Sequence, residues 1–289
     1  MANMIAILGA TGVLGRHVTP RLSADGQRVR ALVRRPEAAG VARACGADIR
    51  VADIFDRDSL RAALEGCDIA INLATALPGP SGRGDFVAND RLRREGTPIW
   101  VKACREAGVA RVLQQSIAMV NAAGDLLADE DTAPAEIREP TAAAAIAAAI
   151  AMEGAVRGSD LDWIVLRGGL FYGPGTGFDD DWLARAAAGK LRLPGDGNDF
   201  VSLIHITDMA TAVIASVRAW PSCQTLIIAD DSPARWTDVF GYIAKMTGTP
   251  EPTVGGRAGF PSFRVSNAKA RRVLGWSPAY ADYRAGLAR

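Results

Sequence analysis

The sequence predicts an α/β protein in which helices cover both faces of a doubly wound parallel sheet, with a small C-terminal α/β lobe. Three observations support this prediction. Short apolar runs alternate with helical patterns through the first two-thirds of the chain. The first of these runs leads into a glycine-rich turn. Beyond Arg167 the alternation gives way to glycine-rich loops and shorter segments, which indicates a lobe of different construction.

The predicted strands are short and rich in Val, Ile and Leu, as strands buried on both faces of a sheet are. They are Met4–Leu8, Arg28–Val33, Asp48–Val51, Ile69–Leu73, Arg111–Gln115 and Trp163–Leu166. The helical segments between them are Val13–Ala24, Ser59–Leu64, Thr97–Ala107 and Thr141–Arg157. Gly26, Gly66 and Gly108 predict helix ends, because a left-handed cap favours glycine. This order requires right-handed crossovers, which place helices on both faces of the sheet.

The last third of the chain predicts shorter elements. We expect a loop over Gly168–Gly177, a helix over Asp180–Ala188, a strand and helix over Phe200–Val217, a strand over Thr225–Ala229 and a helix over Asn267–Gly275. Ser232 and Pro233 predict the start of a helix that reaches Met246, with serine as the cap and proline at the first helical position. Residues 78–84 are expected to form a loop after the fourth strand, on the side where such sheets bind ligands.

The bulk composition excludes several classes of protein. The chain has 289 residues, is 49% hydrophobic and has a net charge of +1, so no overall field would attract nucleic acid or an anionic membrane. The longest apolar stretch, Ala142–Met152, is too short to span a bilayer, and no signal-peptide pattern precedes the first strand. Four scattered cysteines and only two histidines lead us to expect a cytoplasmic protein with reduced thiols and no metal site.

The glycine-rich turn has the spacing of a dinucleotide-binding loop. Gly9, Gly12 and Gly15 follow the first strand and open the first helix, and this context makes the motif specific. The first glycine permits a tight turn, the second lets the backbone approach a pyrophosphate, and the third allows close packing of helix on strand. The phosphates are expected at the helix N-terminus, where free N–H groups and the dipole favour anions. The motif therefore predicts a Rossmann domain.

The ends of the following strands predict the rest of the cofactor site. Arg34 and Arg35 follow the second strand, where an arginine accommodates the additional phosphate of NADP. We therefore expect NADP(H), with a solvated basic turn as the alternative. Asp53 follows the third strand and suits the adenine amino group. The predicted cofactor-binding residues in this part of the chain are Gly9, Thr11, Gly12, Val13, Leu14, Gly15, Arg34, Arg35, Asp53, Ile54, Leu73, Ala74 and Thr75.

Four further motifs are typical of one family. They are Glu95–Thr97 ahead of a helix, Arg167–Gly175, His205–Ala210 and Lys269–Pro278. With the glycine loop, they resemble the extended and atypical short-chain dehydrogenase/reductases, the NAD-dependent epimerase/dehydratase group, over nearly the whole chain. The resemblance implies NAD(P)-dependent chemistry on a carbonyl or alcohol, and cofactor contacts at Gly169 and Leu170. It also implies an NADP-binding domain of residues 1–171 with about 200–230, and a substrate lobe of residues 172–199 with 231–289.

The same resemblance makes the helix over Thr141–Arg157 unusual. The family places a Tyr-x-x-x-Lys pair there, one turn before a glutamate that Glu153 matches. Counting back puts Ala149 at the lysine position and Ala145 at the tyrosine position. The stretch from Ala142 to Met152 contains no tyrosine or lysine in any register, so the loss of the usual proton donor does not depend on the count.

Other groups are candidates for the remaining catalytic roles. Ser116, after the fifth strand, matches the family serine or threonine that hydrogen-bonds the substrate oxygen. Tyr172, in the loop after the sixth strand, is a candidate acid, and packing on the cofactor is its alternative. His205 matches a family histidine that is usually structural. Water or the substrate itself are further proton sources, since a phenol beside the target carbonyl has its own proton.

These observations predict an NADPH-dependent ketoreductase of a small aromatic or polyketide-like natural-product carbonyl, with a noncanonical proton donor for which the substrate itself is one candidate. Two alternatives remain open: a non-redox isomerase, cyclase or lyase on the same scaffold, and a non-catalytic NADP-binding regulator. The expected partner is a small-molecule substrate, without nucleic acid or membrane. Alanine-rich helix faces are compatible with a homodimer and do not require one.

Overall fold

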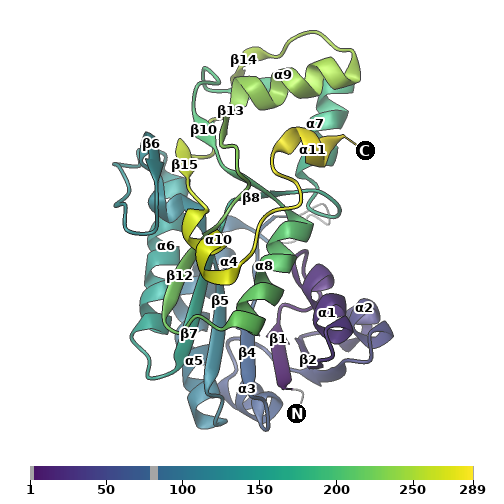
Figure 1. The fold of residues 1–289 in the computed structure, drawn as a ribbon, viewed down its shortest axis with the longest axis vertical. Helices are drawn as coiled ribbons and strands as arrows, with labels where there is room; N and C mark the ends of the chain where they lie inside the picture. The colour runs from purple at the N-terminus through teal and green to yellow at the C-terminus, as the bar shows by residue number, and fades with distance from the viewer. Residues whose placement is uncertain (1–2, 79–83, 289) are drawn as a thin grey trace. The chain divides into compact units, whose positions relative to one another are not determined.

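The predicted alternation of strands and helices is present in the structure, a computed structural model that describes residues 3–78 and 84–288 (Figure 1). Strands β1 (Met4–Leu8), β2 (Arg28–Val33) and β3 (Asp48–Val51) begin and end at the predicted residues. Strands β4 (Ile69–Asn72), β5 (Arg111–Ile117) and β7 (Asp162–Gly168) differ from the prediction by one or two residues at an end. Most of the predicted ligand-side loop, residues 79–83, lies outside the described residues.

The central sheet is parallel and its strand order reverses at β1. The order is β12–β7–β5–β4–β1–β2–β3, where β12 spans Gln224–Ile228. β1 pairs with β2 on one side, with Ile5 opposite Val29, and with β4 on the other, with Ile5 opposite Ile69. The chain therefore winds outward in both directions, which confirms the doubly wound prediction. Ligands of such sheets bind outside the carboxyl ends of the strands, at the point where the order reverses.

By its contacts the chain divides into two compact units. Unit 1 comprises Met1–Ser116, Ala147–Leu166 and Ala210–Thr225, and unit 2 comprises the rest, Ile117–Ile146, Arg167–Met209 and Leu226–Arg289. The second unit contains residues 117–146, 167–171, 200–209 and 226–230, which the prediction placed in the NADP-binding domain. Strand pairing gives the physical reason for the first two segments, because a strand that begins in each of them pairs with a later strand of unit 2.

The helices of unit 1 follow the predicted pattern, with additions. They are α1 (Gly15–Ala24), α2 (Gly40–Ala44), α3 (Arg57–Leu64), α4 (Phe86–Arg91), α5 (Thr97–Glu106), the later part of α6 (Pro140–Arg157) and most of α8 (Ile206–Ala219). Helices α2 and α4 were not predicted from the sequence, because they are short and have no clear apolar stripe. A π-helical turn over Leu92–Gly96 joins α4 to α5, and a short 3-10 turn spans Pro36–Ala38.

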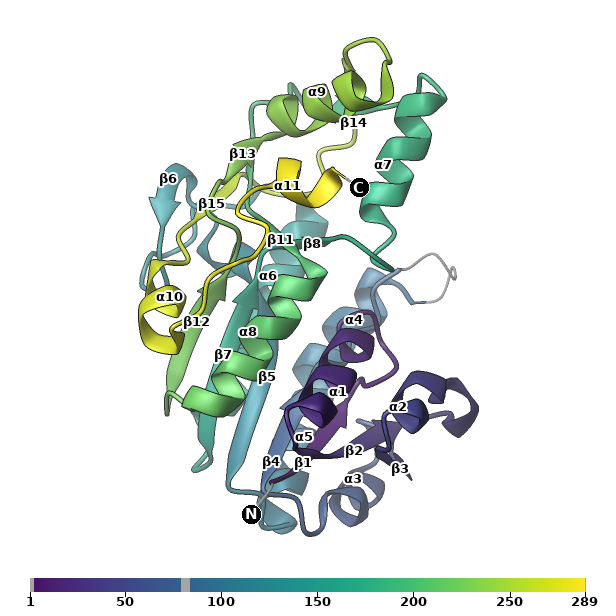
Figure 2. The same cartoon turned by 45° about the vertical axis from the view of Figure 1, so that its right-hand side comes forward.

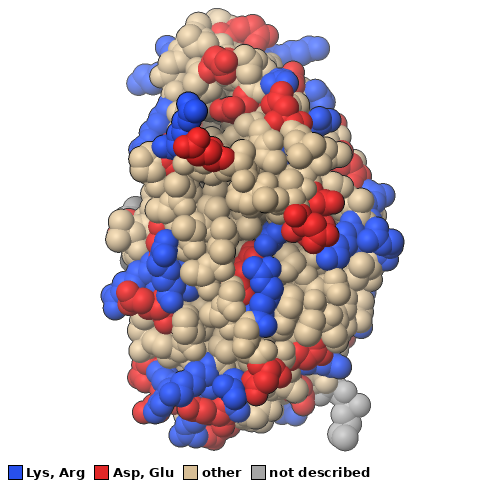
Figure 3. All heavy atoms as spheres, turned by 90° about the vertical axis from the view of Figure 1, so that its left-hand side faces the viewer, with Lys and Arg blue, Asp and Glu red and all other residues tan. Residues whose placement is uncertain are grey.

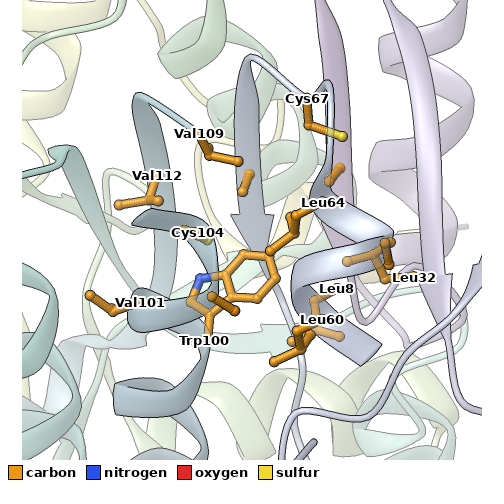
Figure 4. Close-up of a cluster of buried hydrophobic side chains, with 14 of the residues drawn as sticks. Leu8, Leu32, Leu60, Leu64, Cys67, Trp100, Val101, Cys104, Val109 and Val112 are labelled. Carbon is orange, nitrogen blue, oxygen red and sulfur yellow. The ribbon is translucent and has the colours of Figure 1, made fainter. Parts of the chain in front are cut away.

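One face of the sheet in unit 1 packs on α3, α5 and α6 around a buried tryptophan (Figure 4). Trp100 of α5 is 1% exposed and lies among leucines and valines from the sheet and from α3. Alternate residues of β1 point to opposite faces of the sheet. Ile5 and Ile7 are fully buried on the face opposite to the one that packs on Trp100. Strands buried on both faces explain the near-continuous apolar runs in the sequence.

Unit 2 consists of short strand pairs and helices. Its strands are β6 (Gly124–Ala128), β8 (Leu170–Tyr172), β9 (Arg192–Pro194), β10 (Phe200–Val201), β11 (Leu203–His205), β13 (Ala234–Arg235), β14 (Thr253–Gly256) and β15 (Phe263–Val265). The pairs are β6–β15, β8–β11, β9–β14 and β10–β13. Its helices are α7 (Phe178–Ala187), α9 (Trp236–Thr247), α10 (Ala268–Leu274) and α11 (Tyr283–Leu287), besides a 3-10 turn over Ala118–Asn121 (Figure 2).

The aromatic residues of α7 and α9 form much of the unit 2 core. Trp182 of α7 packs against Trp236 and Phe240 of α9, with ring centroids 5.9 and 5.7 Å apart. Trp182 and Trp236 are both buried. These residues therefore belong to the core, which is where aromatic side chains are most often found.

One helix start was predicted wrongly. Helix α9 begins at Trp236, with Arg235 as its cap, and not at Ser232–Pro233. Ala234 and Arg235 pair instead with Val201 and Phe200 in an antiparallel ladder. Their backbone groups are used in this ladder, so the helix begins only after it.

Charged side chains of both signs are intermixed over the face drawn in Figure 3, in keeping with the small net charge. Within the described residues, every helix falls short of the length and apolarity that a bilayer crossing requires. In the same part of the chain, no three His, Cys, Asp or Glu side chains are grouped as a metal site would need.

Candidate cofactor-binding site

The glycine loop of unit 1 is built around close backbone approaches. Gly9 has a φ of +86°, and a Cβ on it would lie 2.7 Å from the Ala74 nitrogen. The Gly12 N–H donates to the Gly9 carbonyl at 2.9 Å, which closes the turn. A Cβ on Gly15, where α1 begins, would lie 2.7 Å from the Ala10 Cα. Each glycine of the motif therefore stands where backbone passes too close for a side chain, or where a ligand must come near.

The other predicted cofactor residues of unit 1 follow the carboxyl ends of β2, β3 and β4. Arg34 and Arg35 are exposed directly after β2. The Asp53 carboxylate accepts from the Phe55 N–H at 2.9 Å, and the Asp53 N–H donates to the Ser59 hydroxyl at 3.2 Å. Because parallel strands end at the same edge of a sheet, these residues lie at the edge where Gly9 begins the loop.

This arrangement fits a nicotinamide dinucleotide. The loop lies between a strand and a helix N-terminus, which suits a pyrophosphate. Two exposed guanidinium groups follow the neighbouring strand, and such groups bind a phosphate strongly. When bound, the reduced cofactor supplies a hydride.

Behind the end of β4 lies a group of buried amide side chains. The Asn72 amide donates to Gln114 Oε1 at 2.9 Å, and the Gln114 amide donates to the Gln115 carbonyl at 2.8 Å and to Met152 Sδ at 3.3 Å. Asn72 Oδ1 accepts from the Ala74 N–H at 3.1 Å. This group was not predicted from the sequence, although two adjacent glutamines in the buried strand β5 indicate a polar group there.

Ser116 has a different partner from the one predicted. Its hydroxyl is fully buried and donates to Glu153 Oε1 at 2.7 Å, while Glu153 Oε2 pairs with Arg157 at 3.0 Å. A hydroxyl has one proton to donate, and in this structure Ser116 uses it to tie β5 to α6. Its predicted hydrogen bond to a substrate oxygen stays a prediction.

Glu153 has a second cation nearby. Arg93, in the π-helical turn, is 5% exposed. Burial lowers the pKa of its guanidinium, and the carboxylates of Asp90 and Glu153 oppose this by favouring the charged form. Gly96 ends the same turn, and a Cβ on it would lie 3.0 Å from the Ile54 side chain. The turn thus lies between Ile54, a predicted cofactor contact, and the charged end of α6.

Tyr172 belongs to the core of unit 2. Its ring is fully buried, and its hydroxyl donates to the Asp282 carbonyl at 3.3 Å. Burial raises the pKa of Tyr172, and the carboxylates of Asp230 and Asp208 raise it further. A proton donor must reach the substrate and release its proton, and burial in this core does not favour either. The catalytic role of Tyr172 stays a prediction.

His205 packs beside Tyr172 in the same core. Its ring centroid lies 5.2 Å from that of Tyr172 and 4.0 Å from that of Tyr280. These contacts agree with the structural role that the family resemblance implies. Gly169 and Leu170 precede Tyr172 and stand at the start of β8, where the Gly169 N–H donates to the Ile228 carbonyl at 2.9 Å. Their predicted contact with the cofactor stays a prediction.

Helix α6 contains alanine at both predicted catalytic positions. Ala149 is fully buried and lies one turn before Glu153, and Ala145 is partly exposed. A methyl group can neither donate nor accept a proton. The described chain therefore has no tyrosine or lysine along this helix, from Pro140 to Arg157.

Comparison with known proteins agrees with this site. The model of an NAD(P)H-binding family matches residues 9–218. A 3-diazoavenalumate denitrifying reductase of a Streptomyces species is 35% identical, with 99% of each chain covered. A 4-hydroxy-2-methyl-3-oxo-4-farnesyl-3,4-dihydroquinoline-1-oxide ketoreductase of Stigmatella aurantiaca is 25% identical over 78% of this chain and 68% of its own.

Solved structures show the same fold. The UDP-glucose 4-epimerase of Thermus thermophilus in complex with NAD superposes with a TM-score of 0.77 at 19% identity, with 98% of this chain and 96% of that chain covered. The relatives named above are both reductases, which supports a reductase role on a nicotinamide-binding fold. The chain therefore belongs to the NAD(P)H-binding family of short-chain dehydrogenase/reductases and has the fold of the NAD-dependent epimerases.

Proposed function

We propose that this protein is an NADPH-dependent reductase that acts on a diazo compound and releases its nitrogen as dinitrogen. The observation that supports this most is α6, where Ala145 and Ala149 leave no proton donor. The Ser116 hydroxyl donates to Glu153 and the Tyr172 hydroxyl donates to the Asp282 carbonyl, which supports a reaction that uses neither as the proton donor.

The proton balance of the two candidate reductions differs. A carbonyl that receives a hydride on carbon also takes one proton on oxygen, and a positioned acid normally provides it. A diazonium group that receives a hydride loses dinitrogen, and its carbon keeps the hydrogen. The positive charge of a diazonium ion cancels the negative charge of the hydride, so reduction of that ion consumes no proton. A neutral diazo compound reaches the same product by taking one proton from solution, not on the atom that receives the hydride. A site without an acid therefore suits a diazonium substrate.

The similarity to the Streptomyces enzyme supports the same substrate class. That protein is named as a denitrifying reductase of a diazo compound, and the 35% identity extends over 99% of both chains. For the cofactor, exposed Arg34 and Arg35 after β2 support NADPH, since guanidinium groups bind the additional phosphate.

The test uses 3-diazoavenalumate that has isotopically labelled nitrogen, together with NADPH and the purified protein. We expect loss of the nicotinamide absorbance and release of labelled dinitrogen in equal amounts. Cofactor labelled with deuterium at the transferred position should leave deuterium on the carbon that held the diazo group. Turnover without cofactor oxidation would instead support a non-redox isomerase, cyclase or lyase, and binding without turnover would support a regulator.

The second candidate is the ketoreductase predicted from the sequence, acting on an aromatic or polyketide-like carbonyl with a proton from the substrate. The name of the Stigmatella relative favours it. A phenol beside the carbonyl would provide the missing acid. Reduction of a carbonyl oxidises NADPH without release of dinitrogen, whereas reduction of a diazo group releases one dinitrogen for each NADPH oxidised, so the two candidates are separated by one measurement.

A further inference from the structure

A chain of buried hydrogen bonds joins helix α6 to the backbone after β4, entirely within unit 1. It runs from Met152 Sδ to the Gln114 amide at 3.3 Å, from Gln114 Oε1 to the Asn72 amide at 2.9 Å, and from Asn72 Oδ1 to the Ala74 N–H at 3.1 Å. Asn72 is 0%, Gln114 3% and Met152 2% exposed. Water therefore does not compete for these bonds.

Gln114 is an unusual residue for the centre of a buried strand. Burial of an amide without hydrogen-bond partners is unfavourable, so such a group needs partners within the protein. Here the oxygen accepts from Asn72, and the nitrogen donates to Met152 and to the Gln115 carbonyl at 2.8 Å. A satisfied buried network of this kind favours one arrangement of the groups that it joins.

The group that the network fixes is the backbone beside the glycine loop. A Cβ on Gly9 would lie 2.7 Å from the Ala74 nitrogen and 2.7 Å from the Leu73 carbonyl carbon. The Leu73 N–H donates to the Leu8 carbonyl at 2.9 Å, and the Ala76 N–H donates to Asn89 Oδ1 at 3.0 Å. The stretch from Leu73 to Ala76 is thus held against the loop by successive hydrogen bonds of its backbone N–H groups. Gln114 supports the central one of these, the bond from the Ala74 N–H.

We propose that Gln114 is a positioning residue for the nicotinamide cofactor. Through Asn72 it holds the Ala74 amide, and with it the Leu73–Thr75 backbone, in the place that cofactor binding requires. Helix α6 has alanine at the two predicted catalytic positions. Through the hydrogen bond between Met152 and Gln114, it still helps to position the cofactor site. The proposal rests on nicotinamide binding alone and is independent of the substrate.

The neighbouring residue provides a matched control. Gln115 is also in β5 and is 8% exposed, but its amide donates only to the Ser116 carbonyl among the bonds found in the described chain, at 2.7 Å. Gln114→Met and Gln115→Met each replace a buried amide by an apolar side chain of similar length. Both are expected to lower the melting temperature, Gln114→Met by more, because it removes three buried hydrogen bonds and Gln115→Met removes one.

Cofactor binding should separate the two variants. We expect Gln114→Met to raise the Kd of NADPH about tenfold, as loss of a buried hydrogen-bond link does, and to speed hydrogen exchange at the Ala74 amide in the cofactor-free protein. Gln115→Met should leave the Kd of NADPH and the exchange rate of the Ala74 amide within about twofold of the wild type. Gln114→Glu keeps the acceptor for Asn72 and should restore protection of the Ala74 amide.

Two results would overturn the proposal. One is an equal Kd in the Gln114→Met and Gln115→Met variants, and the other is unchanged exchange at Ala74 in Gln114→Met. If Gln114→Met does not fold, Asn72→Ser breaks the same link from its other end, and an unchanged Kd in that variant also overturns the proposal. None of these measurements involves the substrate, so their outcome is separate from the test of diazo reduction.

Discussion

At the scale of single residues, the two hydroxyl groups predicted to be catalytic, those of Ser116 and Tyr172, donate hydrogen bonds to other parts of the protein. Ser116 bonds to Glu153, which is 37 positions away, and Tyr172 bonds to the Asp282 backbone, which is 110 positions away. No local pattern contains these partners. A family motif predicts where a hydroxyl stands in the chain, but the tertiary structure decides what it donates to.

Tyr172→Phe tests whether Tyr172 is the proton donor that the sequence predicts. The substitution removes one hydrogen bond from the core and leaves the ring in place, so we expect a stability loss of about 1 kcal/mol and a kcat within about twofold of the wild type. Thermal unfolding and steady-state kinetics check both values. A loss of kcat by about a hundredfold, with an unchanged melting temperature, would restore Tyr172 as a proton donor.

Asp230 predicts a pH dependence of stability. Burial raises the pKa of its carboxyl from 3.8 to about 8, the Ser232 N–H opposes the rise, and the carboxylates of Asp282, Asp231 and Asp208 add to it. The native state therefore keeps a proton that the unfolded state has released, in the window between these two pKa values. Stability should fall as the pH rises through this window and level off above it.

Asp230→Asn removes this titration while keeping the acceptor for the Ser232 N–H. We expect the melting temperature of the variant to fall less than that of the wild type between about pH 5 and about pH 8. The variant should therefore gain stability relative to the wild type as the pH rises. Parallel curves of melting temperature against pH would show that Asp230 does not titrate in this range.

At the scale of elements, the sequence predicted best what depends on local pattern. Strands β1, β2 and β3 have their predicted bounds, and Gly26, Gly66 and Gly108 all have positive φ values, as predicted helix ends should. The missed elements are those that depend on distant partners. The strand β6 exists only as the partner of β15, more than a hundred residues later, and α9 begins late because Ala234 and Arg235 first pair with β10.

The end of β2 provides the prediction at this scale. If Arg34 and Arg35 bind the additional phosphate of NADPH, changing both to alanine should raise KM for NADPH by about 10–100-fold, since hydrogen bonds between charged groups contribute about 1.5–3 kcal/mol. KM for NADH should change little. Arg43→Ala, at an exposed arginine of the nearby α2, is the matched control. Equal effects on both cofactors would contradict a role in phosphate recognition.

At the scale of the whole molecule, the fold class and the family followed from the sequence, whereas the chemistry did not. The glycine motif, its strand–turn–helix context and the alternation of elements predicted a doubly wound nicotinamide-binding fold, and the sheet order and the family match confirm it. The absence of a tyrosine or lysine on α6 was also readable, because it needs only the residues of one helix. The Gln114 network was not, since it joins two strands and a helix that the sequence separates.

The central claim is that reduction proceeds here without a proton from the protein. Its most direct test is the stoichiometry of NADPH and dinitrogen during turnover of 3-diazoavenalumate, with cofactor that has deuterium at the transferred position. The account predicts one dinitrogen released for each NADPH oxidised, and deuterium from the cofactor on the carbon that held the diazo group. Oxidation of NADPH with the diazo nitrogen retained, or hydrogen from the solvent in place of that deuterium, would contradict it.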